Sequence, residues 1–537
     1  MRNKIIALLR NVIEEDIEIV VSSPENYAFG HYSTSVAFSL AKIWKMSPTV
    51  AAEKLKEKII AIDKDKLFKE INVVSPGFIN FWISSDKLEG EFKEILKKKN
   101  KYGKPSSSKG VRLPKIQVEF ISANPTGPLT MANGRGGFLG DVLSNILEFT
   151  GKKVEREYYV NDTGNQIITL GKSLLASIGL IADEEKFYKG GYIKTWALKN
   201  KAFIKKNQKN PLLIGKKAAK ELLANIKKVI IKKSGIKFDR FTSEDSQIHK
   251  KDLIKKTLEI FSTKGLIYDK EGAKWLKTTE FGDDKDRVLI TSDGFPTYFL
   301  ADAGHLLETK TRGFSNKILI LGPDHYGYVA RVKAAAKIIG LANFETLITQ
   351  AVRIIKDGVE VKMSKRKGEF ITFEEVVDKV GVDAARFFFL MHAPESHMDF
   401  DLKLAKERSV KNPVYYIQYA YVRCGAILQK VKSQKSKVKI ESKNLESLKS
   451  EVSEKLTMKL IKFPEIIEDI QKDYQVHRLT RYASELSHIF HNFYEKERII
   501  GETNINLIYS RIMFIEATQI VLGGVLNLLG ISKPKKM

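Results

Sequence analysis

The pattern between residues 116 and 161 constrains the fold more than any other part of the chain. Ile116–Ser122 reads IQVEFIS and predicts a buried strand, and EREYYVN, which ends at Asn161, predicts another. Between them, after the break NPTGP, apolar residues recur at helical spacing: Phe138, Leu139, Val142, Leu143, Ile146 and Leu147. A strand, a helix and a strand in this order form a βαβ unit. The chain therefore contains a parallel sheet, because parallel strands need such a crossover.

The rest of the chain divides around this sheet. A length of 537 residues predicts three or four domains, at roughly 150 residues each. Residues 1–105 predict a small α/β domain, and the polar segment KKKNKYGKPSSSK at 97–109 predicts a linker. The sheet domain is expected over 110–400, with a lysine-rich helical insertion at about 185–240. The helical pattern of 401–537 predicts an all-α domain.

Further strands are expected outside the βαβ unit. They are short apolar or alternating runs bounded by turn residues. The runs are Ile17–Val21, Ile71–Ile83, Arg287–Ile290, Ile318–Leu321 and Leu347–Ile355.

The net positive charge of the chain limits the kinds of molecule that it is expected to bind. Lys and Arg number 91 against 64 Asp and Glu, a formal net charge of +27. Such a field attracts polyanions, so nucleic acid or an acidic membrane surface comes first among possible partners. The excess is mostly lysine, so a lysine-biased genome is an alternative origin, although it leaves the attraction in place.

Targeting and membrane signals are weak. The longest apolar stretch, near Ile520–Ile531, is interrupted by Gly523, Gly524 and Asn527, and the amino terminus lacks the pattern of a signal peptide. The single cysteine, Cys424, excludes an internal disulfide and suits a reducing compartment. We expect a cytoplasmic protein without a membrane partner.

The turn after the first predicted strand is rich in glycine. It reads SANPTGPLTMANGRGG from Ser122 to Gly137 and leads into a helix whose free N–H groups could bind phosphate. It matches neither a Walker A loop nor GxGxxG. The alternative is that Gly134, Gly136 and Gly137 serve only the close packing of helix against sheet.

A second candidate segment is KMSKRKG, from Lys362 to Gly368. Its closely spaced cations suit a loop that folds over a polyphosphate, since Lys and Arg bond phosphoryl oxygens. A solvated charged surface is the ordinary reading of such a run, but the string KMSKR is more specific than that.

KMSKR resembles the second signature of class I aminoacyl-tRNA synthetases, and the surrounding segments are similar to the arginyl-tRNA synthetase family. These segments follow that family's order: SANPTGPL, GRGGFLGDVL, EREYYVNDTGNQI, DGFPTYFLADAGHL, LGPDHYGYVARVKAAAKIIG, VGVDAARFFFL and NPVYYIQYAYVR. FGHYSTSVAFSLAK and VVSPGFINFW resemble its amino-terminal domain, and RYASELSHIFHNFYEK its anticodon-binding domain. The resemblance covers essentially the whole chain.

The resemblance implies a fold and a set of roles. The fold is α/β: a Rossmann-type parallel-sheet catalytic domain, a small α/β amino-terminal add-on that binds the tRNA elbow, and an all-α carboxyl-terminal anticodon-binding domain. The implied catalytic residues are Lys362, Ser364, Lys365, Arg366, Thr130 and Asn133. The implied ATP-binding residues are Gly134, Gly322, Asp324, His325 and Met363. The implied arginine-binding residues are Asn124, Glu244, Tyr298 and Asp302, and the implied tRNA-binding residues are Tyr32, Tyr415 and Tyr419.

The residue types of the implied arginine pocket suit its ligand. Arginine carries a planar cation with a fork of donors, which carboxylates and aromatic faces bind well. Tyr298 and Asp302 are four residues apart, so on a helix they share one face. Glu244 could instead cap a helix, because SED is an ordinary capping sequence.

The sequence departs from the family pattern at two places, and both bear on the expected rate of catalysis. The family's first signature, HIGH, has histidines at the positions of Thr130 and Asn133, where this chain reads TMAN. Thr and Asn can donate hydrogen bonds to phosphate but cannot be cations. Ala301 stands where the family commonly has arginine.

The sequence therefore predicts an arginine–tRNA ligase that uses ATP with Mg²⁺, L-arginine and tRNA(Arg), holds no tightly bound metal of its own, and acts as a monomer. Two alternatives remain. A degenerate synthetase that binds tRNA without charging it is favoured by TMAN and opposed by the intact KMSKR. A non-enzymatic RNA-binding protein would explain the charge but not the arginine-shaped residue set.

Overall fold

The amino-terminal domain is a small α/β unit, as expected. The computed structural model describes residues 1–105, 114–341, 343–361, 371–434, 450–499 and 501–537. The antiparallel sheet has the order β1-β2-β4-β3. Its elements are α1 (Arg2–Arg10), β1 (Val21–Ser22), β2 (Tyr32–Thr34), α2 (Val36–Trp44), α3 (Pro48–Ile62), β3 (Phe68–Val74), β4 (Phe78–Ile83) and α4 (Ser85–Lys98). The single strand expected over Ile71–Ile83 is thus a hairpin of β3 and β4, and the strand expected at Ile17–Val21 begins only at Val21.

The central sheet confirms the predicted parallel βαβ unit. Five parallel strands have the order β12-β11-β5-β6-β7. They are β5 (Lys115–Glu119), β6 (Lys153–Val160), β7 (Arg240–Ser243), β11 (Asn316–Leu321) and β12 (Asn343–Ile348). The crossover helix α5 (Met131–Phe149) and the helix α12 (Val329–Ile339) connect neighbouring strands. This is the Rossmann-type α/β architecture expected from the sequence.

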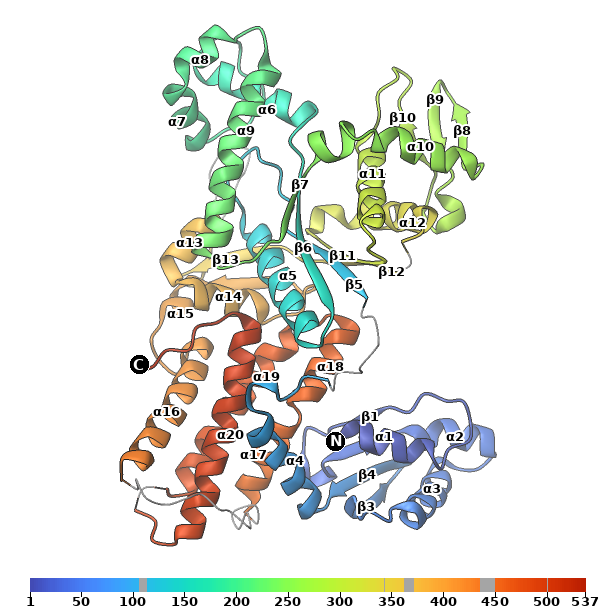
Figure 1. The fold of residues 1–537 in the computed structure, drawn as a ribbon, viewed down its shortest axis with the longest axis vertical. Helices are drawn as coiled ribbons and strands as arrows, with labels where there is room; N and C mark the ends of the chain where they lie inside the picture. The colour runs from blue at the N-terminus through green and yellow to red at the C-terminus, as the bar shows by residue number, and fades with distance from the viewer. Residues whose placement is uncertain (106–113, 342, 362–370, 435–449, 500) are drawn as a thin grey trace.

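Two insertions interrupt the sheet domain (Figure 1). Between β6 and β7 lies a helical lobe with its own buried core. It consists of α6 (Asn165–Ser177), α7 (Gly191–Lys199), α8 (Lys201–Lys206) and α9 (Pro211–Lys227). Between β7 and β11 lie α10 (Leu253–Thr263), β8 (Ile267–Lys270), β9 (Ala273–Leu276), β10 (Arg287–Ile290) and α11 (Tyr298–Thr311). The strand predicted at Arg287–Ile290 is present, but it belongs to a separate antiparallel sheet with β9 and β8.

A second small sheet closes the catalytic domain. Its strands are β13 (Val352–Lys356), β14 (Val359–Glu360) and β15 (Met398–Asp401), with β13 in the middle. The strand expected over Leu347–Ile355 is therefore two strands, β12 and β13, which lie in different sheets. The helices α13 (Phe373–Val380) and α14 (Val382–Leu390) come between β14 and β15.

The carboxyl-terminal part is helical, as predicted. Its helices are α15 (Leu402–Lys406), α16 (Pro413–Gln434), α17 (Glu451–Ile461), α18 (Phe463–Asp473), α19 (His477–Lys496) and α20 (Ile505–Leu529). By length and composition α20 could cross a membrane, which differs from the expectation of an interrupted apolar run. Its most apolar window is 67% buried among the other helices, as in the core helix of a soluble protein.

The amino-terminal domain rests on this helical domain (Figure 1). The hydroxyl of Tyr32 donates to Glu465 Oε1 on α18 at 2.8 Å, and the His31 imidazole lies 2.8 Å from Glu454 on α17. The apolar core runs without a break from this domain through the helical domain to the α5 face of the sheet.

Candidate active site

The predicted site residues gather where the order of the sheet reverses. The chain leaves β5 for β6 and β7 on one side, and later adds β11 and β12 on the other. Open α/β sheets bind ligands outside the carboxyl ends of their strands at such a switch point. Here that place lies between the turn after β5 and the segment that begins at Gly322.

The turn after β5 has a strained backbone. Ile121 and Ser122 have φ values of 65° and 36°, a region that side chains bearing a Cβ rarely occupy. Such conformations cost of order 1–3 kcal/mol each and concentrate at functional sites. Hydrogen bonds hold the turn: Ser122 Oγ donates to Glu119 Oε1 at 3.0 Å and accepts from the Tyr159 amide at 3.0 Å.

Thr130 and Asn133 form the amino-terminal cap of α5. The Asn133 carboxamide oxygen accepts from both the amide and the hydroxyl of Thr130, each at 2.9 Å. The Thr130 hydroxyl proton is therefore used inside the cap. The Nδ2 amide of Asn133 is what remains for a phosphate.

The glycines of α5 serve packing. A Cβ on Gly134 would lie 2.2 Å from the Phe373 ring, and one on Gly137 would lie 2.8 Å from Ile121. The Gly134 amide already donates to Thr130 O at 3.1 Å. Close packing therefore explains why residue 134 is glycine, and its role in ATP binding stays a prediction.

The helix α13, which follows the second signature in the chain, contacts the start of α5. The Phe373 amide donates to Leu129 O at 3.0 Å, and the Phe373 ring covers Gly134. Lys362, Met363, Ser364, Lys365 and Arg366 lie outside the described residues. The chain that follows them is nevertheless held against the start of α5.

The other predicted ATP residues follow β11. Gly322 precedes a short helical turn (Pro323–Tyr328) that carries Asp324 and His325, both exposed. Asn124, also exposed, lies in the turn after the neighbouring strand β5. These positions border the switch point from both sides.

The predicted arginine-binding carboxylates come together on α11 and at the end of β7. Tyr298 and Asp302 lie one turn apart on α11, as expected, and Tyr298 is 54% exposed. Glu244 follows β7 and is buried. It makes no capping hydrogen bond, and its carboxylate instead lies 3.2 Å from His249 Nε2.

Both carboxyl groups hold protons unusually tightly. Burial, opposed by a hydrogen bond from Tyr328 and assisted by the charge of Glu244, raises the pKa of Asp302 to about 7. Burial also raises the pKa of Glu244, although His249 opposes it. In the part of the chain that the structure describes, no lysine or arginine pairs with Asp302. The pair is therefore suited to an external cation.

Two tyrosines that the sequence reasoning missed complete this pocket. The Tyr328 hydroxyl donates to Asp302, and burial beside Glu244 and Asp302 raises the pKa of Tyr159 well above its ordinary value. Tyr159 lies in the apolar end of β6, where an aromatic residue reads as core. The signal that could have found it is its place one residue before the strand end.

The predicted tRNA residues are placed differently from one another. Tyr32 is fully buried and bonds Glu465, so here it joins two domains and offers no surface to RNA, contrary to its predicted role. Tyr415 and Tyr419 are partly exposed on α16. Tyr419 stacks on His491 with a centroid distance of 5.6 Å, close to the guanidinium of Arg423.

Two other features do not form the site. A cavity of about 900 Å³ lies between α10, α11 and β7, and its lining includes none of the predicted site residues. Glu119, Glu157 and His305 are close enough together to bind a metal ion. However, the Lys317 ammonium lies 2.7 Å from Glu119, so we assign them to a charge network.

Comparison with protein families agrees with this layout. Residues 1–83 match the arginyl tRNA synthetase N terminal domain, residues 91–388 match the class I (R) tRNA synthetase catalytic domain, and residues 417–537 match the DALR anticodon binding domain. The catalytic match alone covers more than half of the chain.

Individual relatives extend the match over nearly the full length. The chain is 38% identical to the arginine–tRNA ligase of Citrifermentans bemidjiense over 97% of this chain and 95% of that protein. It is 39% identical to that of Carboxydothermus hydrogenoformans over 98% and 95%. A crystal structure described as an arginyl-tRNA synthetase from Campylobacter jejuni is 32% identical, covers 85% of this chain and all of that chain, and has a TM-score of 0.74. The chain therefore belongs to the arginyl-tRNA synthetase family.

Proposed function

We propose that this protein is an arginine–tRNA ligase. In the first step the arginine carboxylate attacks the α-phosphorus of ATP, which forms arginyl-adenylate and releases pyrophosphate. In the second step a terminal ribose hydroxyl of tRNA attacks the arginyl carbonyl, and AMP leaves. The observation that carries this assignment is the pair of carboxylates formed by buried Glu244 and half-buried Asp302, which have no lysine or arginine partner among the described residues.

The residues divide the work between two subsites. Asp302 and Glu244 bind the guanidinium, and the Tyr298 ring lies over its plane. Asn124 holds the amino end of the substrate. ATP, with Mg²⁺ bound to its phosphates, lies across the switch point near Gly322, Asp324 and His325. Asn133 and the KMSKR cations then stabilise charge that develops on the phosphates.

The helical domain, with Tyr415 and Tyr419, binds the anticodon arm, and residues 1–105 bind the elbow. The protein acts as a monomer in the cytoplasm. Arginine attachment to tRNA tests the assignment directly. Labelled arginine should reach acid-precipitable tRNA only with ATP, and labelled lysine should not.

The pKa of Asp302 predicts how arginine use depends on pH. The guanidinium binds the ionised carboxylate, and the free-enzyme pKa is about 7. We therefore expect kcat/KM for arginine to be constant above about pH 7 and to fall below it, toward tenfold per pH unit. The same ratio for ATP, measured at saturating arginine, should lack this limb. An arginine profile that stays flat from about pH 6 to 8 would contradict the placement of Asp302.

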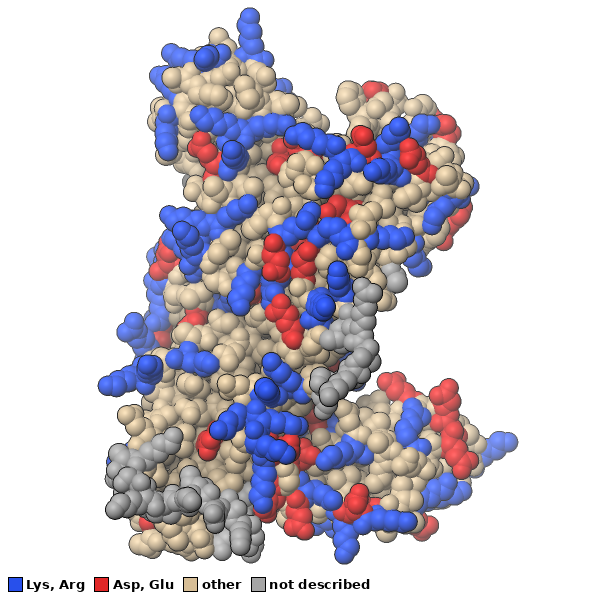
Figure 2. All heavy atoms as spheres, in the orientation of Figure 1, with Lys and Arg blue, Asp and Glu red and all other residues tan. Residues whose placement is uncertain are grey.

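The lysine-rich lobe is expected to bind the tRNA backbone. Between Lys194 and Lys233 the only acidic residue is Glu221, which Trp196 binds at 2.9 Å. Figure 2 shows lysine and arginine side chains spread over this lobe with few acidic ones. Replacement of Lys205, Lys206 and Lys209, all exposed, by Gln should weaken tRNA binding.

The salt dependence of tRNA binding shows whether these lysines neutralise phosphates. Each lysine–phosphate pair that the substitution removes should lower the slope of log Kd against log salt by about 1, so the slope of the triple variant should be smaller by up to about 3. The matched control replaces Lys270, Lys274 and Lys277, which already lie near Glu271, Asp269 and Glu280. Equal slopes for the parent and the lobe variant would show that tRNA passes elsewhere.

A further inference from the structure

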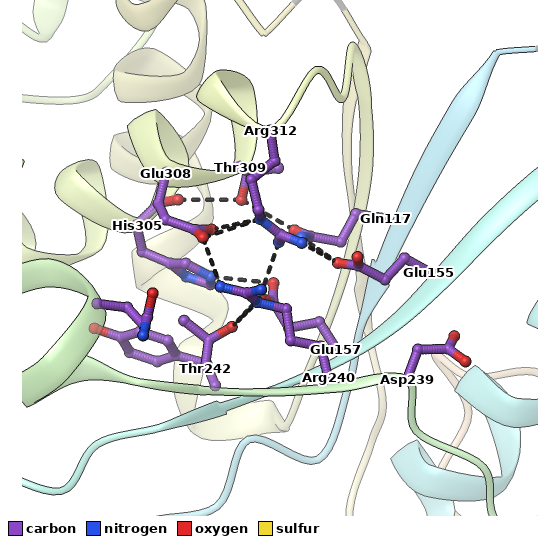
Figure 3. A network of polar contacts seen from close by, with 12 residues as sticks. Gln117, Glu155, Glu157, Asp239, Arg240, Thr242, His305, Glu308, Thr309 and Arg312 are labelled. Carbon is purple, nitrogen blue, oxygen red and sulfur yellow. Dashed lines mark hydrogen bonds and ion pairs between the residues drawn. The ribbon is translucent and has the colours of Figure 1, made fainter.

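A group of buried charged side chains lies beside the candidate arginine pocket. Glu119 at the end of β5 pairs with Glu157 in β6, and His305 of α11 and Lys317 of β11 lie against them. His305 Nε2 is 3.1 Å from Glu157 Oε2, and Lys317 Nζ is 2.7 Å from Glu119 Oε2. We call these four residues the buried charge cluster. Figure 3 shows its His305–Glu157 part with the surrounding Arg240 and Arg312.

Within the buried charge cluster, the negative charge of Glu157 is stabilised by its neighbours. Burial alone would raise the pKa of Glu157, but His305, Lys317 and Thr242 outweigh it and hold that pKa below its usual range. The second ring nitrogen of His305, Nδ1, is 3.7 Å from Glu119 Oε2. A carboxylate therefore lies near each ring nitrogen of His305, and the one at Nε2 is within hydrogen-bond distance.

His305 connects this cluster to the pocket through Tyr159. The two rings stack with a centroid distance of 4.2 Å and an interplanar angle of 15°. Among the described residues, the buried hydroxyl of Tyr159 makes no hydrogen bond of acceptable geometry, although it lies near Glu244. Ring contacts, among them the stack on His305, therefore hold Tyr159 in its apolar cluster.

The cluster also supports the strained turn after β5. Glu119 accepts from Ser122 Oγ, and Ser122 Oγ accepts from the Tyr159 amide. A displacement of His305 would thus reach both the pocket and the turn beside it.

His305 also sets the charge around Asp302. The two residues are three apart on α11, so they share one face of the helix. The groups that act on Asp302 are Tyr328 from the turn after β11, Glu244 after β7, Glu119 from β5, and His305. Asp302 in turn acts on Tyr159 from β6. Glu244 and Glu119 disfavour a negative charge on Asp302, whereas His305 favours it.

We infer that His305 is a positioning residue of the arginine pocket, which holds Tyr159 by stacking and keeps Asp302 ionised for the guanidinium. The inference rests on the proposed function of that pocket. Without His305, the charges of Glu119 and Glu244 are less well opposed, so the carboxyl group of Asp302 holds its proton more tightly. The proton then competes with arginine at neutral pH.

The pH profile of arginine use tests this role. His305→Gln should move the midpoint of the acid limb of kcat/KM for arginine upward by about one pH unit, which lowers that ratio about tenfold near pH 7. The KM for ATP should change less than about twofold. His305→Phe keeps the stacking but not the polar ring nitrogens, so it should show the same shift with a smaller loss at high pH. His397→Gln, an exposed histidine, is the control and should match the parent.

A second variant should shift the pH midpoint in the opposite direction, which general misfolding would not do. Glu119→Gln removes a negative charge that acts on Asp302, so it should move the same midpoint downward. Opposite shifts for Glu119→Gln and His305→Gln would support the inference. It would be overturned by an unmoved midpoint in either variant that folds, or by equal losses of arginine and ATP use. If His305→Gln does not fold, the midpoint of His305→Phe decides.

Failure of the proposed function has a different signature. In that case the parent protein itself shows no arginine-dependent exchange of pyrophosphate into ATP. If the parent is active and its variants keep the parental pH profile, only the role of His305 is wrong.

Discussion

Asp302→Asn is expected to lower kcat/KM for arginine by roughly tenfold to a hundredfold and to leave ATP use nearly unchanged. A hydrogen bond to a charged group contributes about 1.5–3 kcal/mol, and the neutral amide leaves the guanidinium without its counter-charge. Steady-state pyrophosphate exchange, with arginine and ATP varied in turn, measures kcat/KM for each substrate. A change confined to ATP would show that Asp302 lies in the other subsite.

The stability of the same variant separates weaker binding from unfolding. The pKa of Asp302 rises from 3.8 to about 7 on folding, so the folded state holds this proton more tightly than the unfolded state. Ionisation therefore costs folding free energy, and this cost is fully present above the folded pKa. Asparagine removes it, so Tm at about pH 8 should equal or exceed that of the parent. Asp269→Asn, at an exposed position, should change neither quantity.

Asn133→Ala is expected to slow adenylate formation by about 10²–10³, the usual effect of removing one donor to a transition-state charge. It also removes the acceptor of the α5 cap. Asn133→Asp keeps that acceptor but replaces the Nδ2 donor with oxygen, so it should fold as well as the parent and still be slow. Asn133→His retains a donor and should be tolerated. Single-turnover adenylate formation, with tRNA supplied, compares the three.

Lys365→Ala is the reference variant with which the rates of the Asn133 variants are compared. If the cations of the KMSKR segment supply the positive charge that TMAN lacks, Lys365→Ala should slow adenylate formation at least as much as Asn133→Ala does. A parental rate for Asn133→Ala would instead make Asn133 a structural cap alone.

The sequence was informative where function depends on local spacing. The βαβ unit, the switch-point location of SANPTGPL and GPDH, and the helical spacing of Tyr298 and Asp302 all follow from patterns within a few residues. These patterns reflect the backbone geometry of single strands, turns and helices, which residues close in the sequence largely determine.

Long-range contacts explain what the sequence did not show. Gly134 is glycine because Phe373, far along the chain, covers it, and no local pattern contains that contact. Tyr32 reads as a surface aromatic until Glu465 of another domain is placed against it. The charged residues Glu157 and Lys317 lie within strands, where alternation predicts solvent, yet partners from other elements permit their burial.

The most direct test is pyrophosphate exchange into ATP, measured with arginine and tRNA omitted in turn. We expect exchange that requires arginine, and the family resemblance predicts that it also requires tRNA. Equal exchange with and without tRNA would contradict the second requirement alone. A folded protein that binds tRNA but gives no exchange with both substrates present would contradict the ligase assignment, and the chain would then be a synthetase-like tRNA-binding protein.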